Sequence, residues 1–380
     1  MSSPKDQKDP PKDSNNTETT PKVSSQPLQK TSSIASGVSL KTVAEHPEMA
    51  NRRATNAPTD LDADLCPQAV RDKGYNVLPE VLGEGKFSKV YKATKTTNGK
   101  VEDIAVKLIR FDNVESLWRE NQLKNELKIT KRLKHANIIN IFEVIKTRRR
   151  AFIFMEKAEY SMESVLKKKI YTDGLPEKYA QGWFEQILKV LAYLHNEKKV
   201  AHRDLKTDNI LIDSHKQTKL TDFGFATYTR SKDKDIDELK KTHCGTKEYM
   251  APELLYQKSE YDPTPVDMWA AGVILFEMIY NRFPYPMANS NGEPKSTDEI
   301  IKLLKTPVKP PMKWGDKENE RKISKEARDL IKGLMEHDPK NRLTAEQALK
   351  SPWFQIEFPT PKIELFPPTK DGKISNPAKK

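Results

Sequence analysis

Cysteine is scarce in this chain of 380 residues, which contains only Cys66 and Cys244. Two cysteines so far apart exclude a disulfide framework and a cysteine-rich zinc site, and they favour a reducing, intracellular environment. Long hydrophobic runs are also missing, since no apolar stretch approaches the roughly 18 residues of a membrane-spanning helix. The stretch Met1–Pro11 lacks the apolar run of a signal peptide, and Ser2 stands where myristoylation needs glycine. We therefore expect no membrane attachment and an intracellular location, cytoplasmic or nuclear.

Charge of one sign is only in modest excess. The chain has 66 Lys and Arg against 54 Asp and Glu, which gives a formal charge of +12. This excess favours acidic partners such as nucleic acid, anionic lipid or ATP. The basic residues are scattered, however, and the short runs Arg148–Arg150 and Lys167–Lys169 fall near turns, where a solvated surface is the ordinary explanation. Nucleic-acid binding is therefore not expected to be the main function.

The two ends of the chain differ from its middle. Residues 1–70 are rich in Ser, Thr, Pro, Lys and Asn, and we expect a disordered tail because so few large hydrophobes cannot offset the entropy of ordering. Residues 355–380 contain five prolines and no clear periodicity, and we expect a second flexible tail there. The middle is predicted to fold, first as strands and one helix and then as helices. The predicted ranges are strands 75–83, 89–94, 102–109, 138–145 and 151–156, and helices 117–133, 176–194, 266–280, 296–304, 324–335 and 344–350.

The most informative segment places Asp204, Asn209 and Asp222 within nineteen positions. Short strands predicted over 210–212 and 219–221 form a hairpin, which returns Asp222 to the loop that carries Asp204 and Asn209. That arrangement can hold metal ions against a polyphosphate while one carboxylate orients an attacking hydroxyl.

Two features upstream fit the same chemistry. The segment Gly83–Val90 carries glycines between two strands, where backbone N–H groups can approach phosphates closely. Lys107 lies inside an apolar strand, and a buried lysine needs an anion. Glu126 on the following helix can supply one carboxylate, and ATP phosphates can supply further negative charge.

With these features in place, the sequence resembles the eukaryotic protein kinase family from about Tyr75 to Phe354. Within that family its pattern is of the Ser/Thr type, and residues 323–354 are closest to the calcium/calmodulin-dependent-kinase-like group. The resemblance implies an α+β, two-lobed fold over residues 71–354, with a mainly-β N-lobe (about 75–157) that has one helix and a mainly-α C-lobe (about 159–354). The motifs that carry the resemblance are Gly83-x-Gly85, Lys107, Glu126, His202-Arg203-Asp204, Asn209, Asp222-Phe223-Gly224, Ala251-Pro252-Glu253, Asp267 and Arg342.

The resemblance also implies a role for each site residue. Lys107 would contact the α- and β-phosphates of ATP, held by an ion pair with Glu126. Asp204 would accept or orient the proton of the substrate hydroxyl, with Lys206 near the transferred phosphoryl group. Asn209 and Asp222 would bind two Mg²⁺ ions. The implied nucleotide-binding residues, of which the apolar ones could equally be ordinary core, are Leu82, Gly83, Gly85, Val90, Ala105, Lys107, Met155, Glu156, Ala158 and Leu211.

Other matches to the family concern structure. Glu253 and Arg342 are expected to form a buried ion pair, and His202 is expected to pack. Thr130 stands where a bulky apolar residue is usual, which should loosen the inward position of the 117–133 helix.

The same resemblance indicates which residue type accepts the phosphate. The segment His202–Asn209 and the pair Gly245-Thr246 are similar to those of Ser/Thr kinases, which implies transfer of the ATP γ-phosphate to Ser and Thr of protein substrates. Asp208, Glu277 and a carboxylate from Glu159 or Glu163 stand where related kinases bind basic side chains. We therefore predict a preference for Arg or Lys before the target residue.

Regulation is predicted through Thr242, which matches the threonine that is usually phosphorylated in this family. A phosphate there would pair with Arg203 and order the surrounding loop. The phosphate would come from an upstream kinase or from autophosphorylation, and the protein is expected to be a monomer. The competing interpretation is a kinase-like scaffold, whose usual signature is loss of the residues equivalent to Lys107, Asp204 or Asp222. All three are present.

Overall fold

The chain divides into two units, Met1–Ala57 and Pro58–Lys380, and every residue that the computed structural model describes belongs to the second. The described residues are 65–85, 88–111, 116–229, 244–256, 260–285, 287–288, 291–304 and 323–361. Within these ranges no helix is both long and apolar enough to cross a membrane.

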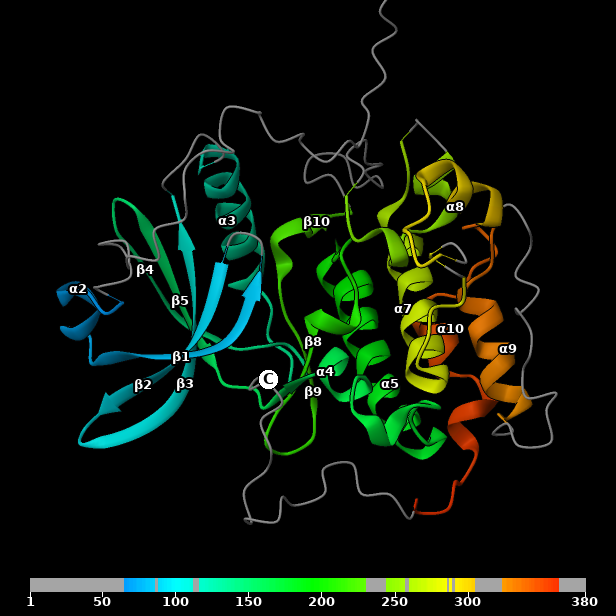
Figure 1. Ribbon diagram of the computed structural model, residues 1–380, viewed down its shortest axis with the longest axis horizontal. Helices are drawn as coiled ribbons and strands as arrows, with labels where there is room; N and C mark the ends of the chain where they lie inside the picture. Colours follow the sequence, from blue (N-terminus) through cyan, green and yellow to red (C-terminus); the bar gives the residue numbers. More distant parts are fainter. Residues whose placement is uncertain are drawn as a thin grey trace, which may run out of the picture. The chain divides into compact units, whose positions relative to one another are not determined.

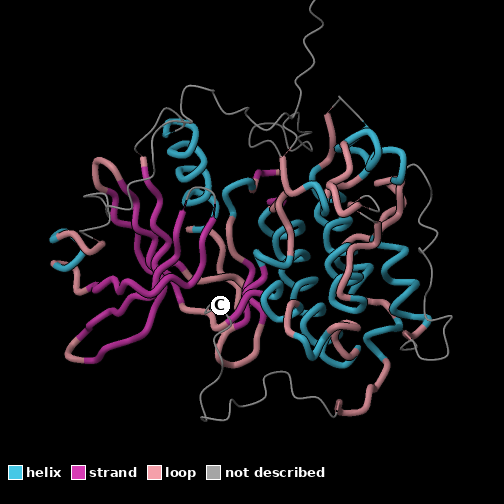
Figure 2. Tube along the Cα trace, viewed as in Figure 1, coloured by secondary structure: helices cyan, strands magenta, loops and turns pink. Residues whose placement is uncertain are grey.

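A five-stranded antiparallel sheet forms the N-lobe (Figure 1, Figure 2). Its strand order is β1-β2-β3-β5-β4, so β5 rather than β4 lies beside β3. Asn98 and Gly99 close the β2–β3 hairpin with φ angles of 50° and 78°, the left-handed values that a two-residue hairpin turn requires. The strands are β1 (Tyr75–Gly85), β2 (Ser88–Thr97), β3 (Lys100–Arg110), β4 (Ile141–Lys146) and β5 (Arg150–Glu156).

The residues of β3 alternate between two hydrophobic clusters, one on each face of this sheet. Ile104, Val106 and Leu108 belong to the first cluster, whereas Ala105 and Ile109 belong to the second. Since successive side chains of a strand point to opposite faces, Lys107 lies on the face of the second cluster. That cluster also contains Leu123 of helix α3 (Ser116–Thr130), so β3 presents its lysine on the side of α3.

The described chain begins before the expected domain boundary. Helix α2 (Gln68–Arg71) buries Val70 completely, and Leu65 and Cys66 pack against the same cluster of the N-lobe. The range 1–70 that composition marked as a tail therefore ends with residues that belong to the N-lobe core. Their apolar side chains are too few to stand out from a polar segment in the sequence.

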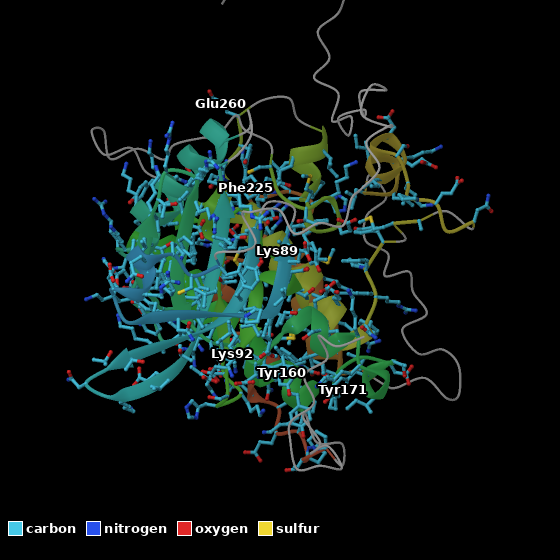
Figure 3. The ribbon with its side chains drawn as sticks, turned by 60° about the vertical axis from the view of Figure 1, so that its left-hand side comes forward. Lys89, Lys92, Tyr160, Tyr171, Phe225 and Glu260 are labelled. Atoms are coloured by element: carbon cyan, nitrogen blue, oxygen red, sulfur yellow. The ribbon has the colours of Figure 1, made fainter. Side chains whose placement is uncertain are left out.

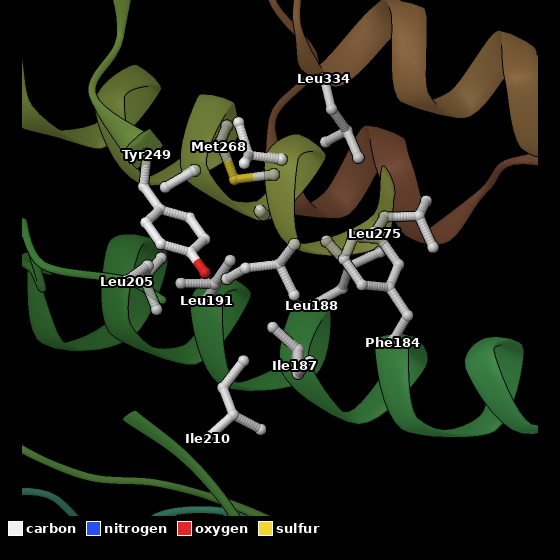
Figure 4. Packing of buried hydrophobic residues seen from close by; sticks show 14 of the residues in the cluster. Phe184, Ile187, Leu188, Leu191, Leu205, Ile210, Tyr249, Met268, Leu275 and Leu334 are labelled. Atoms are coloured by element: carbon white, nitrogen blue, oxygen red, sulfur yellow. The ribbon is translucent and has the colours of Figure 1, made fainter. Parts of the chain in front are cut away.

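Two helices form the centre of the C-lobe, α5 (Glu177–Ala192) and α7 (Pro263–Tyr280) (Figure 4). Helix α5 is amphipathic and contributes Phe184, Ile187, Leu188 and Leu191 to the interface. Helix α7 is buried on nearly all sides, as the absence of a polar face in its sequence predicts. The other α-helices in the described part of this lobe are α4 (Met162–Leu166), α6 (Pro252–Tyr256), α8 (Thr297–Leu304), α9 (Lys325–Leu334) and α10 (Ala345–Leu349).

A short hairpin lies where the lobes meet in Figure 1, made of β8 (Ile210–Ile212) and β9 (Thr218–Leu220). The backbone of Leu220 bonds to that of Ile139 and Asn137 at 2.9 and 2.8 Å, which joins the hairpin to the segment before β4. Two further pairings of very short strands complete the sheets here: β6 (Tyr160–Ser161) lies beside β8, and β7 (Val200–Ala201) lies beside β10 (Thr227–Tyr228).

The two-lobed α+β fold is confirmed, and the differences from the predicted elements lie at their ends. The strand predicted over 219–221 is Thr218–Leu220, and the helix predicted over 117–133 ends at Thr130. The helix α4 and the strand β6 were not predicted, because each is too short for its hydrophobic pattern to repeat.

The predicted ion pair between Glu253 and Arg342 is confirmed as a buried link in the C-lobe. The guanidinium donates to both carboxylate oxygens at 2.7 and 2.9 Å. Arg342 also donates to the carbonyl oxygens of Pro265 and Glu336, and its guanidinium lies 5.2 Å from the ring centroid of Trp269. Because every charged group is paired, this buried arrangement is stable only while both partners remain.

Replacing Arg342 by methionine should therefore destabilise the protein by about 3–5 kcal/mol, because the Glu253 carboxylate stays buried without its cation. Chemical denaturation followed by fluorescence measures the change. The matched control is Lys325→Met, which removes a lysine from an exposed pair with Asp329 and should leave the midpoint unchanged. Equal midpoints for the two variants would contradict the role given to Arg342.

Candidate active site

The carboxylate of Asp267 on α7 holds the loop His202–Asn209 through hydrogen bonds to its backbone. Its two oxygens accept the backbone N–H groups of His202 and Arg203, each at 2.8 Å. One oxygen also lies 2.8 Å from Nε2 of His195, and Asp267 is 1% exposed. The loop needs this anchor because Arg203 has a φ of 66°, a left-handed value that costs energy in a non-glycine residue.

Asp204 is buried, and each of its carboxylate oxygens has a polar neighbour. Thr246 donates its hydroxyl to Oδ1 at 2.9 Å, and the ammonium of Lys206 lies 3.3 Å from Oδ2. Lys206 also donates to the Thr246 hydroxyl at 3.1 Å. Asp204, Lys206 and Thr246 thus each contact the other two, and Asp204 is the residue that the sequence predicted as the base.

Gly245 allows this approach of the Thr246 segment. Its φ is 111°, and a Cβ added there would lie 2.8 Å from the carbonyl oxygen of Arg203. A larger residue would push the segment away from the loop and separate Thr246 from Asp204. The glycine before Thr246 is therefore required by geometry.

Asn209 is turned so that its amide nitrogen faces Asp204. Nδ2 donates to the carbonyl oxygen of Asp204 at 2.9 Å and lies 3.4 Å from Oδ2 of the same residue. The amide oxygen is then left to act as a ligand. Together with the carboxylate of Asp222 it forms an all-oxygen donor set, which is the chemistry that Mg²⁺ prefers, so the residues present fit this ion.

Asp222 occupies a sharp turn that aims its side chain into the space between the lobes. Its φ is 63°, and its carboxylate accepts the N–H of Gly224 at 3.4 Å. The next residue, Phe223, is 1% exposed and packs edge-on against the ring of His202 at 5.0 Å between centroids. His202 in turn lies 3.0 Å from the carbonyl oxygen of Thr221, so it has the packing role expected for it.

Lys107 connects the two lobes. Its ammonium lies 3.6 Å from Glu126 on α3 and 3.4 Å from Asp222. Burial opposes the lysine charge, but the two carboxylates outweigh burial and raise the pKa of Lys107. The same ammonium lowers the pKa of Asp222, whereas burial raises the pKa of Glu126. Three charges from distant parts of the sequence thus meet in one place.

Helix α3 has a second link to the turn that carries Asp222. Asn125 donates its side-chain amide to the carbonyl oxygen of Ala226 at 2.8 Å. Thr130, at the end of the same helix, is buried and donates its hydroxyl to the carbonyl oxygen of Glu126 at 2.7 Å. The hydroxyl is thereby satisfied within the helix, and the Lys107–Glu126 pair forms even though Thr130 is small.

The predicted apolar nucleotide-binding residues gather in the second N-lobe cluster. They come from five different strands or from residues beside them, and the cluster also includes Ile109, Ile153 and Leu123. Glu156, at the end of β5, accepts the backbone N–H of Asn140 at 3.0 Å and pairs with Lys219 at 3.0 Å, so its side chain is engaged within the protein. The gathered residues are Leu82, Val90, Ala105, Met155 and Leu211.

The glycine-containing loop closes the β1–β2 hairpin. Gly83 pairs with Val90 and Gly85 with Ser88, and Lys86 and Phe87 lie outside the described residues. A Cβ added to Gly83 would meet no atom within 4 Å, so protein packing does not require this glycine. Figure 3 labels Lys89 on this hairpin, where it pairs with Glu84 at 3.1 Å.

The guanidinium of Arg203 forms hydrogen bonds with two other residues of the protein. Its Nε donates to the carbonyl oxygen of Phe225 at 2.8 Å, and its Nη1 donates to the hydroxyl of Tyr261 at 3.3 Å. Thr242, the predicted regulatory residue, lies outside the described residues.

Three carboxylates meet beside the loop, those of Glu163, Asp208 and Glu277. Burial raises the pKa of Glu277 to about 7, although the hydroxyl of Tyr249 donates to it at 2.6 Å, and the charge of Asp208 adds to the rise. The sequence left open whether Glu159 or Glu163 joins Asp208 and Glu277, and Glu163 is the one that belongs to this group. Glu159 instead pairs with Lys157 at 2.6 Å.

A lysine of the chain itself lies at the edge of these carboxylates. Lys167 pairs with Glu163 one helical turn away, and this pair raises the pKa of the lysine. The charges of Asp208 and Glu277 add to the same rise. The sequence marked Lys167 only as part of the basic run Lys167–Lys169, and no motif marks Tyr249.

The family model described as "Protein kinase domain" matches residues 76–354. CBL-interacting protein kinase 11 of Oryza sativa subsp. japonica is 32% identical over 275 residues, which are 72% of this chain and 50% of the relative. CBL-interacting protein kinase 26 of the same plant is 32% identical over 274 residues, 72% of this chain and 51% of the relative.

A relative from another plant matches this chain to a similar extent. CBL-interacting serine/threonine-protein kinase 15 of Arabidopsis thaliana is 31% identical over 274 residues, which are 72% of this chain and 59% of the relative. The chain therefore spans about half the length of the curated relatives it matches. Because the matched domain covers both lobes and every motif described above, the chain belongs to the protein kinase family.

Proposed function

We propose that this chain is a serine/threonine protein kinase, which transfers the γ-phosphate of ATP to Ser and Thr hydroxyls of protein substrates. The observation that carries the proposal is the position of Lys107 between Glu126 and Asp222, at 3.6 and 3.4 Å. Phosphoryl transfer depends on positioning and on neutralising phosphate charge, and it needs this lysine–glutamate pair and this aspartate in place together.

The residues of the site would divide the reaction between them. Lys107 would bind the α- and β-phosphates, and the apolar cluster of Leu82, Val90, Ala105, Met155 and Leu211 would enclose the adenine. Asp204 would take the proton from the acceptor hydroxyl while the new oxygen–phosphorus bond forms and the bond to the β-phosphate oxygen breaks. Lys206, 3.3 Å from Asp204, would balance the charge of the phosphoryl group as it moves.

Magnesium is the implied cofactor, and Asn209 and Asp222 would hold two ions. These ions would neutralise phosphate charge during transfer. The glycines at Gly83 and Gly85 would let the β1–β2 hairpin approach the phosphates, and the open space around Gly83 is consistent with that role. Glu156 and Ala158 would contribute through their backbone, because the Glu156 side chain is already engaged.

The group of Glu163, Asp208 and Glu277 supports a preference for basic residues before the target Ser or Thr. Carboxylates that lie close together repel one another, and a cation relieves the repulsion. Lys167 supplies one positive charge to the three carboxylates, and Lys206 supplies a second beside Asp208. A substrate arginine would supply another and could bond two oxygens at once.

A kinase-like scaffold is the alternative function. It would not require the close ion pairs that Lys107 makes with Glu126 and Asp222. The ion pairs of Lys107 therefore favour the enzyme.

Phosphate transfer from Mg-ATP to a basic Ser-containing peptide tests the proposed function. Asp204→Asn should lower kcat by about 10²- to 10⁴-fold, since the amide cannot accept the proton. The control Asp329→Asn removes a carboxylate from an exposed helix pair and should keep full activity. Undiminished transfer by Asp204→Asn would contradict the assignment of the base.

The peptide preference is tested by Glu277→Gln. The KM for a peptide with Arg before the target should rise about tenfold, equivalent to about 1.4 kcal/mol, while a peptide without basic residues should be unaffected. A raised pKa of about 7 also makes the preference depend on pH. Below pH 7 the Glu277 carboxyl is mostly neutral and attracts no cation. The KM of the basic peptide should therefore fall as the pH is raised from 6 to 8.

In Glu277→Gln this pH dependence should be lost. The control Glu185→Gln, which changes a surface pair with Lys189, should keep both the preference and its pH dependence. Equal KM values for basic and neutral peptides in the wild type would show that the carboxylates do not select the substrate.

Activation is proposed to depend on a phosphate at Thr242, with Arg203 as its partner. Phosphate adds a charge of about −1.5 to −2, which would compete for the guanidinium that now bonds to Phe225 and Tyr261. Phosphatase treatment should lower the activity of the wild type, and Thr242→Ala should be as inactive as the treated enzyme. Full activity of Thr242→Ala would contradict the switch.

A further inference from the structure

A cavity of about 570 Å³ lies at the end of α3. It is lined by the end of α3, the segment that follows it, and β4. Its volume falls within the range of about 300–1,000 Å³ that is usual for ligand pockets. Phe142 at its rim is 49% exposed, which is unusual for a phenylalanine in an otherwise folded strand. The apolar part of the lining includes Leu127, Leu133, Ile138, Phe142 and Val144.

The charged side chains of the cavity leave it positive. Two carboxylates line it, and each already has a cation: Glu156 pairs with Lys219 at 3.0 Å, and Glu143 pairs with Lys73. Lys131 and Lys134 also line it. Neither forms an ion pair with another residue in the part of the chain that the structure describes. The cavity therefore presents two ammonium groups beside apolar walls, which suits a segment that alternates aliphatic and acidic residues.

The start of the described chain leads to this cavity. Leu65 and Cys66 pack on the N-lobe, and the thiol of Cys66 lies 3.5 Å from the carbonyl oxygen of Tyr75. Lys73, only seven positions after Cys66, pairs with Glu143 in the cavity lining. The residues before Leu65 therefore start within a short distance of the β4 side of the cavity.

The sequence that precedes Leu65 has the matching composition. It reads Asp60-Leu61-Asp62-Ala63-Asp64, with three carboxylates alternating with two aliphatic side chains. Five extended residues span at most about 17 Å, enough to cross a cavity of this size. In the extended form the aliphatic side chains would point to one face and the carboxylates to the other.

We propose that the segment Asp60–Asp64 binds this cavity in the same molecule, with Leu61 against the apolar wall and its carboxylates beside Lys131 and Lys134. The segment then braces the end of α3. Thr130 lines the cavity too, and its small side chain leaves the room that a bulkier residue would fill. Since Glu126 lies one helical turn before Thr130, the brace holds the helix where Glu126 reaches Lys107.

Zero-length carbodiimide cross-linking of the full chain, followed by mass spectrometry, tests the contact. The expected products are amide bonds from Lys131 or Lys134 to Asp60, Asp62 or Asp64, with a yield that does not change with protein concentration. Leu61→Lys should lower that yield at least about fivefold, because the side chain no longer enters an apolar wall. The matched control is Leu28→Lys, which changes the same kind of residue elsewhere in the segment that precedes Leu65.

Hydrogen–deuterium exchange supplies a second measurement that needs no cross-link. Residues 127–144 should exchange faster in Leu61→Lys than in the wild type or in Leu28→Lys. Three results would overturn the proposal: cross-links to Asp60–Asp64 no more frequent than those to Asp6 or Asp13, cross-links that form only between molecules, or unchanged exchange in Leu61→Lys. None of these readouts depends on phosphate transfer, so they stand or fall separately from the proposed function.

Discussion

Asp267 lies on the buried helix α7 with its carboxylate turned toward the backbone of the loop that carries Asp204. A carboxylate buried this deeply is stable only if its lone pairs are filled, and they are filled by two backbone N–H groups and by His195. The loop in turn is held in a conformation that Arg203 would not adopt alone. The apolar core of the C-lobe thus fixes the position of the site through a single charged side chain.

From that anchor a series of contacts reaches the N-lobe. Arg203 holds the carbonyl oxygen of Phe225, and the neighbouring carbonyl oxygen of Ala226 accepts from Asn125 on α3. The same helix carries Glu126, which meets Lys107 and through it Asp222. A displacement of α3 would therefore disturb two contacts of the Asp222 turn at once, one to its backbone and one to its side chain.

Much of this could be predicted from the sequence, because the residues involved are close together in the chain. Asp204, Asn209 and Asp222 are brought together by a hairpin whose strands are visible in the hydrophobic pattern. The hydrogen bond from Thr246 to Asp204 spans 42 positions, and the bonds that Asp267 accepts from His202 and Arg203 span 65 and 64, so the contacts themselves could not be derived from local patterns. Likewise, only the structure distinguishes Glu163 from Glu159, since either carboxylate could have faced Asp208.

The turn at Asn98 and Gly99 has a consequence for a residue far from it. These two residues set the alignment of β2 with β3, which then continues without interruption from Thr97 opposite Lys100 to Ser88 opposite Ile109. Because side chains alternate along a strand, a slip of one residue would exchange the two faces of β3. Lys107 would then point into the cluster of Tyr75 and Phe154, and Val106 or Leu108 would occupy its place opposite Glu126. The length of the solvent-exposed β2–β3 turn thus determines whether Lys107 or an aliphatic side chain of β3 faces Glu126 in the active site.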